Sequence, residues 1–162
     1  MPIREAVPDD WPAIHPIFAS IVTAGRTYAY PEDATVDRAR ELWMGQGRVV
    51  VAVDDDAVVG TATMGPNRPG RGSHIATGSF MVAPQAQGRG VGRLLGRHVV
   101  EWCRQTGFRG IQFNAVVETN TAAVRLWQSL GFTIIGTVPG AFRHPDDGYV
   151  GLHVMFLPLT ER

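Results

Sequence analysis

The first part of the chain shows apolar residues at helical spacing. After Asp10, which can cap a helix, apolar side chains recur three or four positions apart as far as Ile21, and this spacing predicts an amphipathic helix. Pro16 lies inside the stretch and lacks a backbone N–H, so we expect a kink or a later helix start there. A second, shorter helix is expected over residues 36–44, with Thr35 as its cap.

The remainder of the chain alternates strand-like and helical patterns. β-Branched and apolar runs predict strands over residues 48–53, 57–64, 75–82, 110–117, 132–138 and 149–157. Further helices are expected from the glycine run at 87–92 to Gly107 and from Asn120 to Gly131. Residues 65–73 and 139–148 are expected to be loops. This order predicts one mixed α/β domain over residues 1–162.

The composition allows a folded core but supplies no bulk charge. The chain has 162 residues, of which 44% are hydrophobic, and its 15 basic residues balance 15 acidic ones. This length fits a single compact domain. The neutral balance argues against nucleic acid or an anionic membrane as a partner, because such partners need a positive field. All the basic residues are arginines, which excludes mechanisms that need a lysine, such as Schiff-base catalysis.

The cysteine content and the absence of long apolar runs suggest a cytoplasmic protein. The lone Cys103 cannot form an intramolecular disulfide, which fits a reducing compartment. The chain has no Cys/His ligand spacing, so we expect no metal. Its start does not resemble a signal peptide, and no apolar run approaches the about 18 residues that a membrane helix needs.

The segment richest in chemical information is a glycine run that follows the expected strand 75–82. It consists of Gln87, Gly88, Arg89, Gly90, Val91 and Gly92. Uncovered backbone amides beside a helix N-terminus bind phosphate oxygens, and Arg89 and Arg93 add charged donors. A Walker loop would need Lys-Ser/Thr after the last glycine, and a Rossmann motif would need a further glycine where Arg93 or Leu95 stands. A plain glycine-rich turn is the alternative.

Two motifs in this order resemble the GCN5-related N-acetyltransferase (GNAT) family. The first is Gln/Arg-x-x-Gly-x-Gly/Ala, at residues 87–92, and the second is an Asn that opens a helix ending in Gly-Phe, from Asn120 to Phe132. The first half and the last loop are most similar to the subgroup that acetylates phosphinothricin and related amino acids. The resemblance implies a central mixed sheet that splays open and is flanked by helices.

The resemblance also implies acetyl-CoA as the donor and no metal. The amides from Gly88 to Arg93 would bind the pyrophosphate of coenzyme A. The backbone of Met81 and Val82 would hydrogen-bond the pantetheine arm as an added strand. Asn120 and Ala123 would line the other side of that arm. A homodimer is expected from the resemblance alone.

The catalytic groups depart from the family pattern. The tyrosine that members commonly use to protonate the leaving thiolate corresponds to Trp127, whose indole is not a practical acid. A carboxylate ahead of the cofactor strand corresponds to Thr77. Glu118 could accept a proton through water, or could simply be a carboxylate at a helix start. Tyr149 could protonate the thiolate in place of the missing tyrosine.

The acceptor is expected to be the primary amine of a small, amino-acid-like molecule. Tyr28 and Tyr30, between the first two helices, are candidates for the wall of the acceptor pocket, and core packing is the alternative for both. We expect direct attack of the amine on the thioester in a ternary complex, because Cys103 lies well inside a helix among apolar residues. A protein or peptide acetyltransferase and a catalytically idle acyl-CoA-binding module stay open as alternatives.

Overall fold

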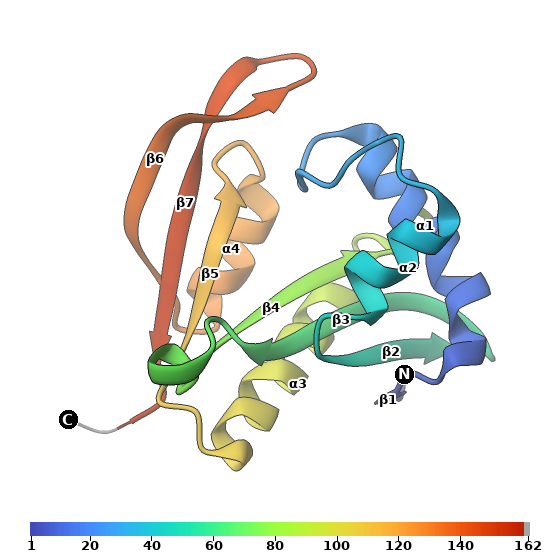
Figure 1. The fold of residues 1–162 in the computed structure, drawn as a ribbon, viewed down its shortest axis with the longest axis horizontal. Helices are drawn as coiled ribbons and strands as arrows, with labels where there is room; N and C mark the ends of the chain where they lie inside the picture. Colours follow the sequence, from blue (N-terminus) through green and yellow to red (C-terminus); the bar gives the residue numbers. More distant parts are fainter. Residues whose placement is uncertain (161–162) are drawn as a thin grey trace.

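The computed structural model describes residues 1–160, which form a seven-stranded mixed sheet with helices on both faces (Figure 1). The strands are β1 (Ile3–Glu5), β2 (Arg48–Asp54), β3 (Ala57–Pro66), β4 (Ile75–Val82), β5 (Gly110–Val117), β6 (Thr133–His144) and β7 (Gly148–Pro158). Their order in the sheet is β1-β2-β3-β4-β5-β7-β6. Neighbouring strands are antiparallel except β4 and β5, which are parallel. The expected α/β class is confirmed.

The α-helices pack against the sheet from opposite sides. They are α1 (Trp11–Ala24), α2 (Val36–Met44), α3 (Val91–Thr106) and α4 (Thr121–Ser129), and short 3-10 turns lie at Pro8–Asp10, Gly70–Gly72 and Pro84–Ala86. The indole of Trp43 on α2 donates a hydrogen bond of 3.1 Å to Thr61. A Cβ at the preceding Gly60 would lie 2.7 Å from Val91 of α3. Because successive strand residues face opposite sides, α2 and α3 cover the two faces of β3.

The later helix start expected at Pro16 was wrong, and the structure has a short strand before the helix that was not expected. Helix α1 runs unbroken through Pro16. Pro16 has no backbone N–H, so the carbonyl of Pro12 lacks its usual hydrogen-bond donor in the helix. Both prolines lie on the exposed side of the helix, where water can bond this carbonyl instead. Strand β1, which was not expected, pairs its three residues with β2. So short a strand carries too little pattern to be recognised from the sequence.

The expected loop at residues 139–148 was also wrong in most of its length. Strand β6 continues to His144, and the turn to β7 spans only residues 145–147. The register between β6 and β7 shifts between Val138 and Phe142, and Gly140 within that shift has φ +63°. This irregularity interrupts the alternation of apolar and polar residues, which hides the strand in the sequence.

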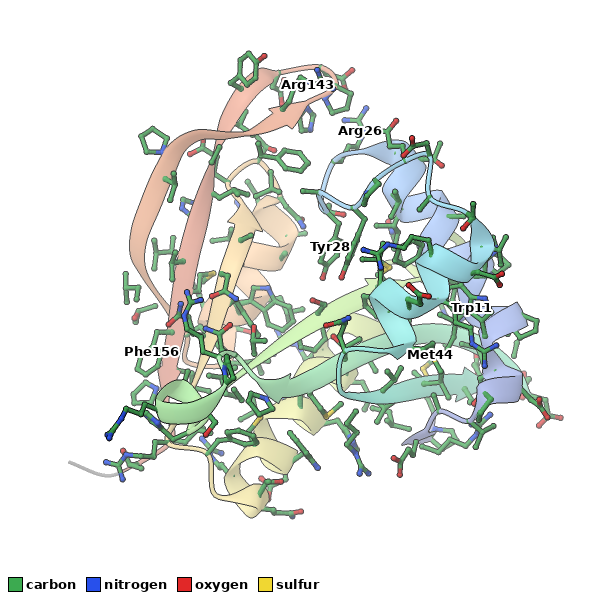
Figure 2. All side chains as sticks on the ribbon, in the orientation of Figure 1. Trp11, Arg26, Tyr28, Met44, Arg143 and Phe156 are labelled. Atoms are coloured by element: carbon green, nitrogen blue, oxygen red, sulfur yellow. The ribbon has the colours of Figure 1, made fainter. Side chains whose placement is uncertain are left out.

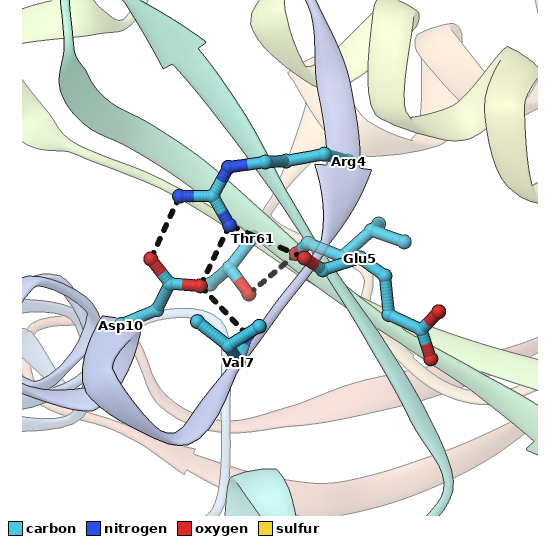
Figure 3. A network of polar contacts seen from close by, with 6 residues as sticks. Arg4, Glu5, Val7, Asp10 and Thr61 are labelled. Atoms are coloured by element: carbon cyan, nitrogen blue, oxygen red, sulfur yellow. Dashed lines mark hydrogen bonds and ion pairs between the residues drawn. The ribbon is translucent and has the colours of Figure 1, made fainter.

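A polar network joins β1 to the start of α1 (Figure 3). The guanidinium of Arg4 donates two hydrogen bonds of 2.8 Å to the two carboxylate oxygens of Asp10. The N–H of Val7 donates a further bond of 2.7 Å to the same carboxylate. The hydrogen bonds from Arg4 hold the pKa of the largely buried Asp10 below its usual value. The network thus fixes the helix that precedes the loop with Tyr28.

Candidate active site

The central strands β4 and β5 are paired only where they begin. The register joins Ile75 to Gly110 and Ala76 to Ile111, and no further pair follows. On its other side β5 has a bulge against β7 between Phe113 and Val116. The strands therefore diverge, and the edge of β4 that faces β5 has no strand partner beyond Ala76. The expected splay of the sheet is confirmed.

A cavity of about 730 Å³ fills the space between the diverging strands. Its lining comes from β4, β5, the start of α3, α4 and the loop between α1 and α2. The rings of Phe80, Phe113 and Trp127 form an aromatic cluster at one wall, with centroids 4.6 to 5.6 Å apart. Trp127 is buried in this cluster and lines the cavity.

The free edge of β4 presents alternate backbone groups to the cavity. The N–H of Ala83 donates to Val59 on β3, and bonded pairs alternate along an antiparallel ladder. Met81 therefore turns its N–H and C=O toward Thr61 on β3, while Phe80 and Val82 turn theirs toward β5. The expectation for Val82 fits this geometry, but the expectation that the backbone of Met81 is free was wrong. The backbone N–H and C=O of Phe80 face the gap between the strands instead.

The glycine loop, which we define as Gln87 to Gly92, lies at the N-terminus of α3. Gly88 and Gly90 have φ of +79° and +81°, and a Cβ on either would meet no atom within 4 Å. All its residues except Arg89, together with Arg93, line the cavity. Arg89 instead forms an ion pair with Asp54 at the β2–β3 turn. Open space, backbone amides and the positive end of α3 make this end of the cavity fit an anionic group.

The opposite wall near the glycine loop is formed by the start of α4. Asn120 caps this helix by accepting a hydrogen bond of 3.3 Å from the N–H of Ala123. Both residues line the cavity. The small side chain of Ala123 leaves room between α4 and the glycine loop.

Tyr28 reaches the free edge of β4 from the loop after α1. Its hydroxyl accepts a hydrogen bond of 2.7 Å from the N–H of Phe80 and donates one of 2.9 Å to the C=O of the same residue. Figure 2 shows the side chain pointing from its loop into the space beside β4. Burial raises the pKa of Tyr28 above its ordinary value.

Tyr30 does not line the cavity, unlike Tyr28. Its ring stacks on Tyr28 with centroids 5.7 Å apart and packs against Phe18 at 5.1 Å. Of the two tyrosines proposed for the acceptor pocket, the structure brings only Tyr28 to the cavity. Tyr30 supports it from the core.

Glu118 and Tyr149 lie outside the cavity lining. The carboxylate of Glu118 accepts a hydrogen bond of 2.7 Å from the N–H of Gly151 on β7. Tyr149 is 74% exposed and is paired across the hairpin with Arg143. Although Glu118 directly follows β5, the structure therefore places neither candidate side chain in the cavity lining. Of the described residues that line the cavity, Tyr28 and Arg93 carry the titratable side chains.

A polar cluster that the sequence did not indicate lies at the β5 bulge. Asn114 lines the cavity and exchanges hydrogen bonds of 3.2 and 2.7 Å with Asn67, which follows β3. Gln112 donates a bond of 2.9 Å to the same Asn114 oxygen. No local signal marks these residues, because Asn67 and Asn114 are 47 positions apart.

An ion pair joins two segments that border the cavity, the loop after α1 and the β6–β7 hairpin. Arg26, in the loop after α1, lies 2.5 Å from the carboxylate of Asp146 at the β6–β7 turn. Figure 2 shows Arg26 and Arg143 on the two facing segments. Nδ1 of His144, at the end of β6, accepts hydrogen bonds from the N–H groups of Asp146 and Asp147. The loop and the hairpin thus meet beside the cavity.

Residues 1–160 contain neither a membrane-spanning helix nor a metal-binding cluster. None of the helices in this range is long and apolar enough to cross a membrane. Within the same range, no group of three or more His, Cys, Asp or Glu side chains could hold a metal ion.

The fold is shared with solved acetyltransferase structures. A GCN5-related N-acetyltransferase from Kribbella flavida is 60% identical, with a TM-score of 0.94 over 97% of this chain and 96% of that one. The yncA protein of Salmonella typhimurium, solved with its cofactor acetyl-CoA, is 28% identical, with a TM-score of 0.84 over 100% of this chain and 95% of that one.

Sequence comparison points to the same family. The N-acetyltransferase aca1 of Schizosaccharomyces pombe is 36% identical over 60% of this chain, but the match spans only 47% of that protein. The L-methionine sulfoximine/L-methionine sulfone acetyltransferase of Salmonella typhimurium is 32% identical over 86% of this chain and 84% of its own length. Residues 11–132 match the acetyltransferase (GNAT) family. The chain therefore belongs to the GNAT acetyltransferase family.

Proposed function

We propose that the protein transfers the acetyl group of acetyl-CoA to the primary amine of a small, amino-acid-like molecule. The observation that carries this proposal is the cavity between β4 and β5, which joins a glycine loop suited to an anionic group to an unpaired strand edge. The Salmonella relative, whose substrates are amino-acid analogues, supports the acceptor class.

Acetyl-CoA would lie in the cavity with its pyrophosphate at the glycine loop and its thioester toward Phe80. The amides from Gly88 to Arg93 would hold the pyrophosphate at the start of α3. The pantetheine arm would then run along β4, with the backbone of Val82 as a strand-like partner and Asn120 and Ala123 on the other side. When bound, acetyl-CoA supplies a thioester whose acyl carbon is open to attack by an amine.

A small acceptor fits the mouth of the cavity better than a peptide. The Arg26–Asp146 pair joins the two segments on either side of the opening. Thr27 and Tyr28 line one side below it, and Phe142 and Leu152 line the other. A bridged opening of this kind favours a compact molecule over an extended chain. A protein or peptide acetyltransferase would need this bridge to open.

Direct attack of the amine on the thioester agrees with the burial and the raised pKa of Cys103. Its thiol is buried in α3, and burial raises its pKa to about 12. A protonated, inaccessible thiol is a poor acceptor for an acyl group, so an acyl-enzyme route has no nucleophile there. The amine must enter neutral or lose its proton to water, because Glu118 is bonded to Gly151 and does not line the cavity.

The experiment that tests the proposal measures thiol release from acetyl-CoA. Free amino acids, methionine sulfoximine and phosphinothricin analogues, polyamines and short peptides would be compared with a blank without acceptor. We expect turnover with small amino-acid-like amines. Turnover confined to peptides would contradict the acceptor class.

A catalytically idle acyl-CoA-binding module is the second candidate. It is favoured by Trp127, which stands at the wall of the cavity without an acidic proton. Such a module would bind acetyl-CoA, with a raised melting temperature, and would release no thiol with any acceptor. Thiol release above the blank excludes it.

A further inference from the structure

The hydroxyl of Tyr28 occupies a defined position on the free edge of β4. A chain that adds to this edge from the glycine loop meets Val82 first and Phe80 about 7 Å farther on, at about 3.3 Å per residue. The N–H and C=O of Phe80 are both bonded to the Tyr28 oxygen. The backbone of Val82 has the same orientation. An arm that runs along β4 from the glycine loop would therefore end beside the hydroxyl of Tyr28.

We propose that Tyr28 is a catalytic residue whose hydroxyl, together with the N–H of Phe80, binds the carbonyl oxygen of the thioester. This inference rests on the proposed acetyl transfer. The Tyr28 oxygen now occupies the acceptor position of the Phe80 N–H. The Tyr28 hydroxyl moves off that position when the thioester oxygen takes it, and the phenolic O–H turns from the C=O of Phe80 to the thioester oxygen. Two donors then converge on one carbonyl oxygen.

These donors act on charge that develops during transfer. The neutral amine attacks the acyl carbon and forms a C–N bond, while the carbonyl π electrons move to the oxygen that Tyr28 and Phe80 hold. The carbonyl then reforms, the C–S bond breaks, and sulfur leaves with its electron pair. The proton lost by the amine passes through water and balances the thiolate. Preorganised donors stabilise the transient negative oxygen more than the ground-state carbonyl.

The surroundings of Tyr28 suit a donor that keeps its proton. Burial raises the pKa of its phenol, so it stays neutral over the pH range in which amines react. On the other side of the Phe80 backbone, the Phe80 ring packs against Trp127 and Phe113. Such an apolar wall strengthens hydrogen bonds to developing charge. Tyr149, which is 74% exposed, has no comparable setting.

A purely obstructive role makes the opposite prediction for binding. If Tyr28 only covered the edge of β4, every arm that added there would have to displace its hydroxyl and would gain no hydrogen bond from it. Removing that hydroxyl would then tighten the binding of acetyl-CoA and of CoA alike. A catalytic hydroxyl instead favours the ligand that carries the carbonyl oxygen.

The test is Tyr28→Phe, studied by calorimetry with acetyl-CoA and CoA and by kinetics. We expect kcat to fall about 10²-fold, as for the loss of one oxyanion donor. The ratio of the Kd for acetyl-CoA to that for CoA should rise, by no more than about tenfold for one hydrogen bond. In the wild type, acetyl-CoA but not CoA should shift the backbone amide resonance of Phe80. Tighter binding of both ligands, or an unchanged kcat, would overturn the proposal.

Tyr30→Phe is the matched control. It removes the hydroxyl of the ring that stacks on Tyr28 but does not line the cavity. A parallel fall in kcat in both variants, with equal losses of melting temperature, would assign the effect to the aromatic stack and contradict the proposal. The calorimetric ratio needs no acceptor. It therefore tests Tyr28 even if no amine is acetylated, which would refute the proposed function separately.

Discussion

Replacing Gly90 by alanine separates ligand binding at the glycine loop from folding. Gly90 precedes α3 with φ +81°, and a Cβ there would meet no atom within 4 Å. Gly107 follows the same helix with φ +95° and equally open surroundings. Alanine in this left-handed conformation costs about 1–2 kcal/mol. Gly90→Ala and Gly107→Ala should therefore lose similar free energies of unfolding.

Only the change at Gly90 should impair binding of CoA. Gly90 lines the cavity beside the first amides of α3, whereas Gly107 lies at the other end of that helix. A methyl group in the phosphate space would cost at least one charge-assisted hydrogen bond, worth about 1.5–3 kcal/mol. This corresponds to a Kd about 10- to 150-fold higher.

The assay pairs calorimetry with CoA and urea denaturation of each variant. We expect matched losses of stability and a weakened Kd in Gly90→Ala alone. If both variants kept the wild-type Kd, the glycine loop would not hold the pyrophosphate. Equal weakening in both would instead trace the effect to α3 as a whole.

Three further changes test the ion pairs and the buried thiol. Asp10→Asn should lower the free energy of unfolding by about 1–2 kcal/mol at pH 7. Because the pKa of Asp10 is lower in the folded than in the unfolded state, this difference from the wild type should shrink in urea titrations as the pH falls below about 4. Arg26→Ala should raise the acceptor KM, with less effect at high salt and a melting temperature near that of the wild type, because the pair with Asp146 is exposed. Cys103→Ala should keep kcat and sequential kinetics, and its loss of turnover while folded would favour an acyl-enzyme.

The elements that the sequence predicted correctly are those with an uninterrupted local pattern. Helix α3 carries a regular apolar stripe from Val91 to Cys103, on which Val91, Leu95, Val99 and Cys103 are buried. Only the second half of β6, residues 139–144, escaped recognition, because the register shifts near Gly140 and the apolar alternation breaks there. In this half only Phe142 and His144 are buried. A pattern of burial cannot reveal a stretch that buries so little.

Within the candidate site, features encoded by neighbouring residues could be predicted from the sequence, and contacts between distant residues could not. The glycine loop was predictable, because its backbone conformation and its neighbouring helix are encoded within a few residues. The bond between Tyr28 and Phe80 joins positions 52 apart and has no local signature. Glu118 precedes a helix, as many carboxylates do, yet it turns to β7. Its carboxylate fits there because Gly151 has no side chain, since a Cβ would lie 2.9 Å from Oε2.

Close helix packing fixes the backbone on which the proposed chemistry depends. A Cβ at Gly96 of α3 would lie 2.8 Å from the ring of Trp127 on α4, so glycine at this position allows the two helices to approach. With the helices this close, the ring of Trp127 packs against the ring of Phe80, with centroids 4.6 Å apart. Tyr28 holds the backbone of the same residue from the opposite side. The backbone of Phe80 is therefore held from two directions before any ligand binds, so that its N–H keeps its place when the Tyr28 hydroxyl moves to meet a ligand.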